Sequence, residues 1–224
     1  MKVIISGSRG ITDTGRLNRA ILAAQFDVTH VISGACPNSP DMMGVAWAKR
    51  QDPVVPVTLM PADWDSLGKR AGMARNCDMA QEADALIALW DGVSPGTRHM
   101  IDEAVARGLH HYIDATCPNC GRGEEVAIYR FIQPAGPLDQ IRAMCRGCLV
   151  RRGGDISFFD AFGLWGNHAL HIAKFKPVKE TEVNLPLPPR MEVKGLVFGA
   201  KQYRREAKQI KQLPPERKQE SLFA

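Results

Sequence analysis

The sequence predicts an α/β protein with an open, mostly parallel sheet in residues 1–114, a small cysteine-containing module in residues 115–175 and an extended basic tail in residues 176–224. In the first segment, short apolar runs alternate with stretches of helical periodicity, which is typical of parallel strands joined by right-handed crossovers. The second segment contains two Cys-x-x-Cys pairs, and prolines and basic residues become frequent in the third.

The first segment is organised around residues 83–98, where a strand runs into a turn that opens a helix. Residues 86–90 form a continuous apolar run of the kind found in buried parallel strands. The Gly and Pro residues at 91–96 end that strand, and Thr97 is placed to cap the helix that follows. A helix that begins there presents free N–H groups to an anion such as phosphate. On this stretch alone, an ordinary strand-turn-helix joint explains the pattern equally well.

The other elements of this segment follow the same alternation. Strands are expected over residues 2–5, 28–33, 54–60 and 109–113, and helices over residues 17–24, 43–48 and around Met79. Turns rich in small polar residues follow the first two strands directly. Because ligands of such sheets bind outside the carboxyl ends of the strands, the sequence predicts a pocket at this edge.

Three motifs in order resemble the YspA-like family of the SLOG superfamily, which comprises Rossmann-like nucleotide-binding domains. They are Ser6-Gly7-Ser8-Arg9, the block from Pro61-Ala62-Asp63-Trp64-Asp65 to Arg75-Asn76, and the run over residues 85–92 followed by Ser94 and Gly96-Thr97. The superfamily also contains the LOG-type phosphoribohydrolases and the DNA-processing protein A. The resemblance covers about residues 1–114 and implies a pocket for a nucleotide or nucleotide derivative. The implied pocket residues are Gly7, Ser8, Arg9, Asp41, Asp63, Trp64, Lys69, Arg75, Asn76, Ser94, Gly96 and Thr97.

Two departures from the family bear on catalysis. The segment over residues 33–41 is one residue longer than the family's Ser-Gly-Gly-Ala-x-Gly-x-Asp and poorer in glycine, although Asp41 keeps its place. The LOG-type hydrolases have a Glu shortly after Gly-Thr, whereas here the nearest acids, Asp102 and Glu103, lie more than a helical turn further on. No catalytic residue is assigned. A protein of DNA or nucleotide metabolism, a non-catalytic module for a nucleotide signal or single-stranded DNA, and an N-glycosidase-like hydrolase all stay open.

Two residues of the implied pocket have alternative roles. Trp64 suits either base stacking or a core or lid position, and Asp63 suits either ligand contact or helix capping.

Two Cys-x-x-Cys pairs bracket a segment in which residues 126–132 are expected to form a strand. Such pairs, separated by a hairpin-sized insert, are typical of a structural zinc ribbon with four thiolate ligands. The predicted ligands are Cys117, Cys120, Cys145 and Cys148. Two independent redox pairs are the alternative interpretation. His168 and His171 have a helical i, i+3 spacing that could ligate a metal but no further ligands nearby, which favours a structural or surface role.

The tail is expected to consist of an extended Pro-rich linker over residues 176–190, a basic helix over residues 201–212 and a terminal hexapeptide. The hexapeptide resembles the sliding-clamp-binding peptides of replication and repair proteins, with Gln219, Leu222 and Phe223 as the contact residues. The net charge of +5 is modest, but the clustered basic residues of the tail and the arginines of the second segment suggest a nucleic-acid partner, although solvated surfaces explain them as well. No apolar run is long enough to span a membrane, and the N-terminus is expected to be a strand rather than a signal. A cytoplasmic protein of a bacterial or phage-infected cell is expected, and homo-oligomerisation stays open.

Overall fold

The structure is a computed structural model that describes residues 1–132, 141–152, 156–176 and 190–193. The chain divides into two compact units, Met1–Val126 and Ala127–Ala224, each described here by itself. The predicted basic helix over 201–212 and the clamp-binding residues Gln219, Leu222 and Phe223 lie outside the described residues. Within the parts of the chain that are described, no helix is both long and apolar enough to cross a membrane.

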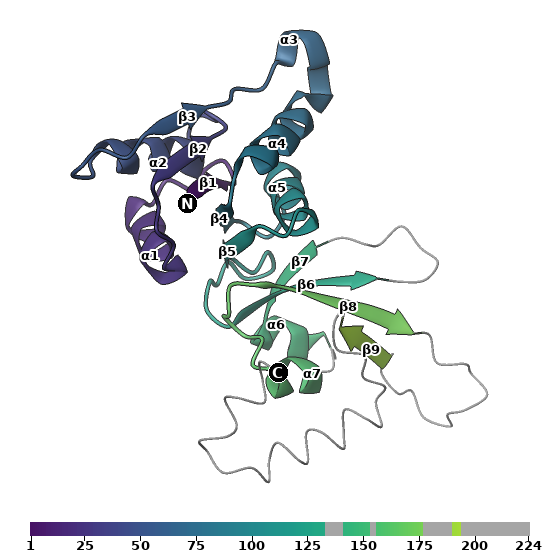
Figure 1. The fold of residues 1–224 in the computed structure, drawn as a ribbon. Helices are drawn as coiled ribbons and strands as arrows, with labels where there is room; N and C mark the ends of the chain where they lie inside the picture. The colour runs from purple at the N-terminus through teal and green to yellow at the C-terminus, as the bar shows by residue number, and fades with distance from the viewer. Residues whose placement is uncertain (133–140, 153–155, 177–189, 194–224) are drawn as a thin grey trace, which may run out of the picture. The chain divides into compact units, whose positions relative to one another are not determined.

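The first unit contains a five-stranded parallel sheet in the order β3-β2-β1-β4-β5 (Figure 1). The strands are β1 (Lys2–Gly7), β2 (His30–Ser33), β3 (Val57–Leu59), β4 (Ala85–Trp90) and β5 (His110–Ala115). The α/β class and the parallel sheet are thus confirmed. The third strand is shorter than the predicted 54–60, because Pro56 has no N–H to give to the ladder and Val54 is exposed.

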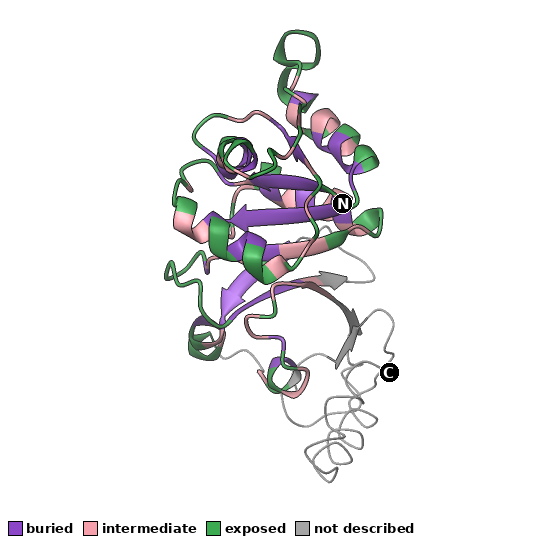
Figure 2. Cartoon of the chain, turned by 60° about the vertical axis from the view of Figure 1, so that its left-hand side comes forward, coloured by how far each residue is buried: buried purple, intermediate pink, exposed green. Residues whose placement is uncertain are grey.

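Helices cover both faces of this sheet, so its central strands are buried (Figure 2). Helices α1 (Thr14–Ala24) and α2 (Pro40–Lys49) enclose a core that contains Val3, Ile5 and Leu17. Helices α4 (Ala71–Glu82) and α5 (Pro95–Ala106) pack against each other and against β1 on the other face (Figure 1). The short α3 (Trp64–Leu67) and a 3-10 turn, η1 (Gly68–Arg70), lead into α4. Every residue of β4 is buried, as its apolar run predicts.

The start of α5 differs from the prediction that Thr97 caps it. The helix begins at Pro95, and Ser94 occupies the N-cap position without a capping side-chain bond. Proline suits the first helical position because its fixed φ matches the helix and its missing N–H is not needed there. Thr97 therefore lies buried within the first turn.

The second unit contains a four-stranded sheet in the order β7-β6-β8-β9, formed by β6 (Val126–Ile132), β7 (Ile141–Cys145), β8 (Leu170–Lys176) and β9 (Arg190–Val193). Strand β6 coincides with the predicted strand over 126–132. Two short helices, α6 (Arg146–Arg151) and α7 (Ser157–Ala161), accompany the sheet. The helical spacing expected for His168 and His171 is wrong, because His171 lies in β8 and His168 has a left-handed backbone with φ 57°.

Candidate functional site

A pocket of about 400 Å³ lies at the carboxyl ends of β1 and β4. The order β3-β2-β1-β4-β5 makes this the switch point at which ligands of open α/β sheets bind. The pocket brings together all the residues implied by the resemblance except Asp63: Gly7, Ser8, Arg9, Asp41, Trp64, Lys69, Arg75, Asn76, Ser94, Gly96 and Thr97. Its lining also contains residues that the sequence analysis did not include: Ser6, Cys36, Gly72, Met73, Pro95 and Met100.

Ser8 connects the end of β1 to the turn after β4. Its backbone N–H donates to the carbonyl oxygen of Leu89 at 2.9 Å. Its hydroxyl accepts from the N–H of Asp91 at 3.1 Å and lies 3.2 Å from Oγ1 of Thr97. The hydroxyls of Ser8 and Thr97 are therefore partnered with the protein itself and fix the two loops against each other.

Asp41 is a buried carboxylate of the pocket. Its Oδ2 accepts from the Gly7 N–H at 3.3 Å and from the Ser39 hydroxyl at 3.0 Å, and Nη1 of Arg75 lies 3.8 Å from Oδ1. Burial raises the pKa of Asp41, and Arg75, Ser39 and Gly7 oppose that rise. The carboxylate thus anchors the end of β1 to the start of α2.

Arg75 and Asn76 on α4 connect two other loops of the pocket. Arg75 donates from Nη1 to the carbonyl oxygen of Gly34 and from Nε to Oδ1 of Asn76, the latter at 3.1 Å. Nδ2 of Asn76 donates to the carbonyl oxygen of Gly96 at 3.0 Å. The loop after β2 is therefore tied to the first turn of α5 through α4.

Asp91 shapes the turn between β4 and α5. Its Oδ1 accepts from the N–H groups of Val93 and Ser94 at 2.9 and 2.7 Å, and its Oδ2 accepts from the Ser94 hydroxyl at 2.5 Å. Burial raises the pKa of Asp91, but these hydrogen bonds outweigh it, and the net pKa is lowered. Sequence reasoning did not assign Asp91 to the site. An Asp that precedes Gly and Ser in a turn is the signal that could have found it.

Several features of the pocket favour an anion. Helix α5 begins without a side-chain cap and has no acidic residue in its first turn. Arg9 and Lys69 are exposed in the lining. Oγ of Ser6 is buried in the lining and has no hydrogen-bond partner among the residues that the structure describes. A negatively charged ligand group that accepts hydrogen bonds would complement the helix start and the two cationic side chains.

An apolar rim completes the lining. The side chains of Trp64 and Met73 are 54% and 51% exposed. Trp64 is therefore not a core residue. Asp63 lies outside the lining and caps α3, because its Oδ1 accepts from the N–H of Ser66 at 3.0 Å. Capping, the alternative role of Asp63, is the one that its position favours.

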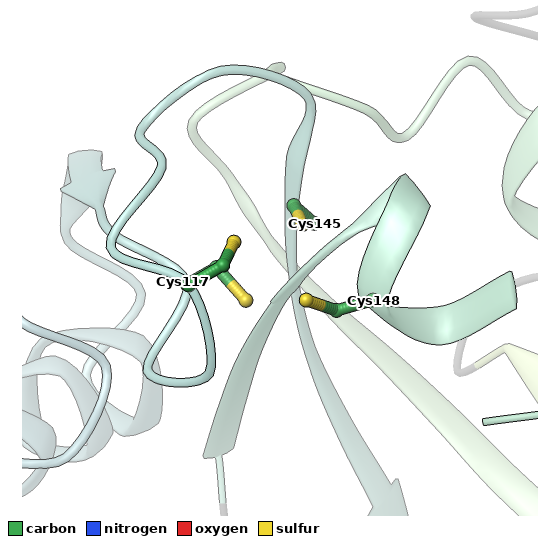
Figure 3. Close-up of side chains that lie close together, drawn as sticks. Cys117, Cys145 and Cys148 are labelled. Atoms are coloured by element: carbon green, nitrogen blue, oxygen red, sulfur yellow. The ribbon is translucent and has the colours of Figure 1, made fainter. Parts of the chain in front are cut away.

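The four predicted metal ligands form a cluster in which the sulfur atoms all lie within 4.8 Å of one another: Cys117, Cys120, Cys145 and Cys148. Figure 3 shows three of these side chains gathered in one place. A tetrahedral zinc ion, with bonds of about 2.3 Å, would hold its sulfur ligands about 3.8 Å apart. The cluster therefore needs little contraction to bind a metal such as zinc.

Backbone hydrogen bonds hold the chain around Cys117 and Cys120 in a tight turn. The N–H of Cys117 donates to the carbonyl oxygen of Arg122 at 2.7 Å. The N–H of Gly121 donates to the carbonyl oxygen of Cys117 at 2.8 Å. Gly121 has φ 73°, in the left-handed region that favours glycine. Nη2 of Arg151 donates to the sulfur of Cys148 at 2.8 Å, which places a positive charge beside a prospective thiolate.

The turn after β4 lies against the loop that begins with Cys117. The N–H of Thr116 donates to the carbonyl oxygen of Trp90 at 2.9 Å. A Cβ on Gly92 would lie 2.8 Å from Cδ of Pro118, and Gly92 has φ 81°. No side chain fits at residue 92 without movement of that loop.

Together these features define a Rossmann-like α/β protein with a cysteine cluster that could bind a metal such as zinc. The chain is 34% identical over 118 residues to the Gene 61 protein of Mycobacterium phage D29, a match that covers 48% of this chain and 91% of the phage protein. It therefore belongs to the family of that phage protein. No family model matches the chain, and no solved structure matches it significantly.

Proposed function

We propose that the pocket binds a nucleotide or nucleotide derivative, with a phosphate group at the first turn of α5. The observation that supports this most directly is the uncapped start of α5 in the same lining as the exposed Arg9 and Lys69. A phosphate oxygen would accept hydrogen bonds from the free N–H groups of that helix start. The positive charges of Arg9 and Lys69 favour a negatively charged group in the same pocket.

The remaining lining suits the base of the nucleotide. Trp64 presents an exposed aromatic face at the rim, and stacking on such faces is how proteins commonly hold bases. A volume of about 400 Å³ is within the usual range for small-molecule sites. The family resemblance implies the same class of ligand for these residues.

Binding is favoured over hydrolysis by the placement of the carboxylates. Asp102 and Glu103, the nearest acids after Gly-Thr, are not in the lining. Asp41 is in the lining but is engaged by Ser39, Gly7 and Arg75. We therefore propose a binding protein in DNA or nucleotide metabolism, and N-glycosidic hydrolysis is the reaction that a turnover assay would test.

The cysteine cluster is proposed to hold a structural Zn²⁺ with all four positions filled by thiolates. A link to DNA is proposed from the basic tail and from Gln219, Leu222 and Phe223, whose pattern resembles sliding-clamp-binding peptides. The membership of a phage protein family is compatible with such a role in an infected cell.

The binding test uses the full chain and native mass spectrometry with nucleoside mono- and triphosphates, NAD, ADP-ribose and short single-stranded DNA. We expect a small nucleotide to be retained, and we expect Trp64→Ala to weaken its binding. Arg19→Ala, on the exposed side of α1, is the control and should bind as the wild type does. Retention of none of the nucleotides, or equal binding by Trp64→Ala and the wild type, would contradict the proposed site.

A further inference from the structure

A second cluster of metal-ligating side chains lies between α4 and α5. Cys77 on α4 and His99 and Glu103 on α5 each offer one ligand atom, and these atoms all lie within 4.8 Å of one another. His99 and Glu103 are one helical turn apart and so face the same side, with Nε2 and Oε1 3.6 Å apart. All three residues are partly buried, and none of them is in the lining of the nucleotide pocket.

We propose that Cys77, His99 and Glu103 form a second metal site, for Zn²⁺ or a similar borderline transition-metal ion. A thiolate, an imidazole and a carboxylate are the ligand types that zinc accepts, and the sulfur disfavours Mg²⁺ and Ca²⁺. Bonds of about 2.0–2.3 Å would set the ligand atoms about 3.3–3.8 Å apart, so small side-chain movements suffice. Three protein ligands leave a fourth position for water or an exogenous ligand.

Glu103 can ligate without losing its ion pair with Arg107, whereas its side-chain hydrogen bond with Cys77 would be replaced when both residues bind the metal. Its Oε2 forms an ion pair with Arg107, whereas Oε1 is the oxygen that faces His99. Coordination through Oε1 would leave Arg107 in place as the outer partner that orients the carboxylate.

His99 would ligate through Nε2 and thereby affect Asn76. Nδ1 of His99 lies 3.4 Å from Nδ2 of Asn76. The orientation of the Asn76 amide is fixed, because its Oδ1 accepts from Arg75 and its Nδ2 donates to Gly96. A metal on Nε2 leaves the proton on Nδ1, opposite an amide donor, so the contact must open. Metal binding would therefore displace Asn76 and, through its hydrogen bond to Gly96, alter the first turn of α5, where the proposed phosphate site lies.

The test counts metal ions on the full-length chain. The protein is first loaded with one equivalent of Zn²⁺, desalted and then titrated with Co²⁺, with stoichiometry read by native mass spectrometry and thiolate ligation by the sulfur-to-cobalt absorption band. We expect the wild type to bind a second equivalent of metal. Cys77→Ser and Glu103→Gln should each lose this second equivalent and retain the first. Glu82→Gln, an exposed acid on α4, is the matched control and should retain both.

Three outcomes would overturn the proposal. The wild type could bind one equivalent only, the second equivalent could survive both substitutions, or Glu82→Gln could lose it to the same extent. Unfolding midpoints of the metal-free variants, compared with the wild type, separate loss of ligands from loss of fold. Metal counting does not depend on the nucleotide, so this result is independent of the proposed function.

Discussion

Replacing Ser6 by Ala separates a ligand-binding role of this residue from a structural one. Ser6 is 7% exposed, and its Oγ is buried without a partner among the described residues. An unsatisfied buried polar group costs about 1–3 kcal/mol. Removal of the hydroxyl should therefore leave the free energy of unfolding of the ligand-free protein unchanged or raise it, by at most about that amount.

Nucleotide affinity should stay unchanged, because Oγ of Ser6 is buried below the surface that a ligand can contact. A direct hydrogen bond to a charged ligand would contribute about 1.5–3 kcal/mol. With about 1.4 kcal/mol per factor of ten, the loss of such a bond would weaken binding about tenfold to a hundredfold. The assays are urea unfolding without ligand and calorimetric titration with the nucleotide that the mass-spectrometric panel identifies.

Ser8→Ala is the matched comparison, because Ser8 is a buried serine two residues further along the chain whose hydroxyl has partners in Asp91 and Thr97. It should destabilise the ligand-free protein by about 1 kcal/mol or more. The reasoning is refuted if Ser6→Ala destabilises the ligand-free protein as much as Ser8→Ala does, or if it weakens nucleotide binding about tenfold or more.

Three further predictions concern stability, pH and metal. Gly7→Ala should lower the free energy of unfolding by about 1–3 kcal/mol, because a Cβ there would overlap Pro40 and the backbone of Leu89. Gly96→Ala should be tolerated, because a Cβ there meets nothing within 4 Å. Urea unfolding of both variants checks this prediction. The pKa of Asp91 is lowered from 3.8, so its stabilising effect is complete above that value and is lost as pH falls through the folded pKa. The stability difference between the wild type and Asp91→Asn should therefore shrink below pH 3.8, and equal differences at pH 7 and pH 3 would contradict this. Chelation of zinc should raise hydrogen exchange around Cys117 and Cys145 before it affects β1 and β4, and unchanged exchange would argue against a bound structural metal.

The sequence predicts the elements whose signals are local. The apolar run of β4 and the strand β6 appear where expected, because a fully buried strand shows a continuous or alternating pattern in its own residues. The start of α5 was misplaced because Thr97 is a good cap residue, whereas the proline two positions earlier already fits the helix. Strand β8 was missed because His168 and His171 suggested a helical spacing that the turn at His168 prevents.

The parts of the site that escaped prediction depend on tertiary contacts. Whether the hydroxyl of Ser6 has a partner is decided by its neighbours in space, so the motif around it gives no indication. Cys77 and His99 are far apart in sequence and meet only because α4 packs against α5. Cys-x-x-Cys pairs, in contrast, place two ligands by local geometry and are recognisable from spacing alone.

Gly92 has a consequence for how this protein can vary. Gly92 lies within the turn after β4 and has a left-handed backbone that disfavours any side chain, and it abuts Pro118 in the loop that begins with Cys117. The turn after β4 and the cysteine loop look independent in the sequence. In the structure they are in contact at residue 92, where there is no room for a side chain. A change in the length or bulk of either loop requires a compensating change in the other, so we expect the two loops to co-vary among relatives that contain both.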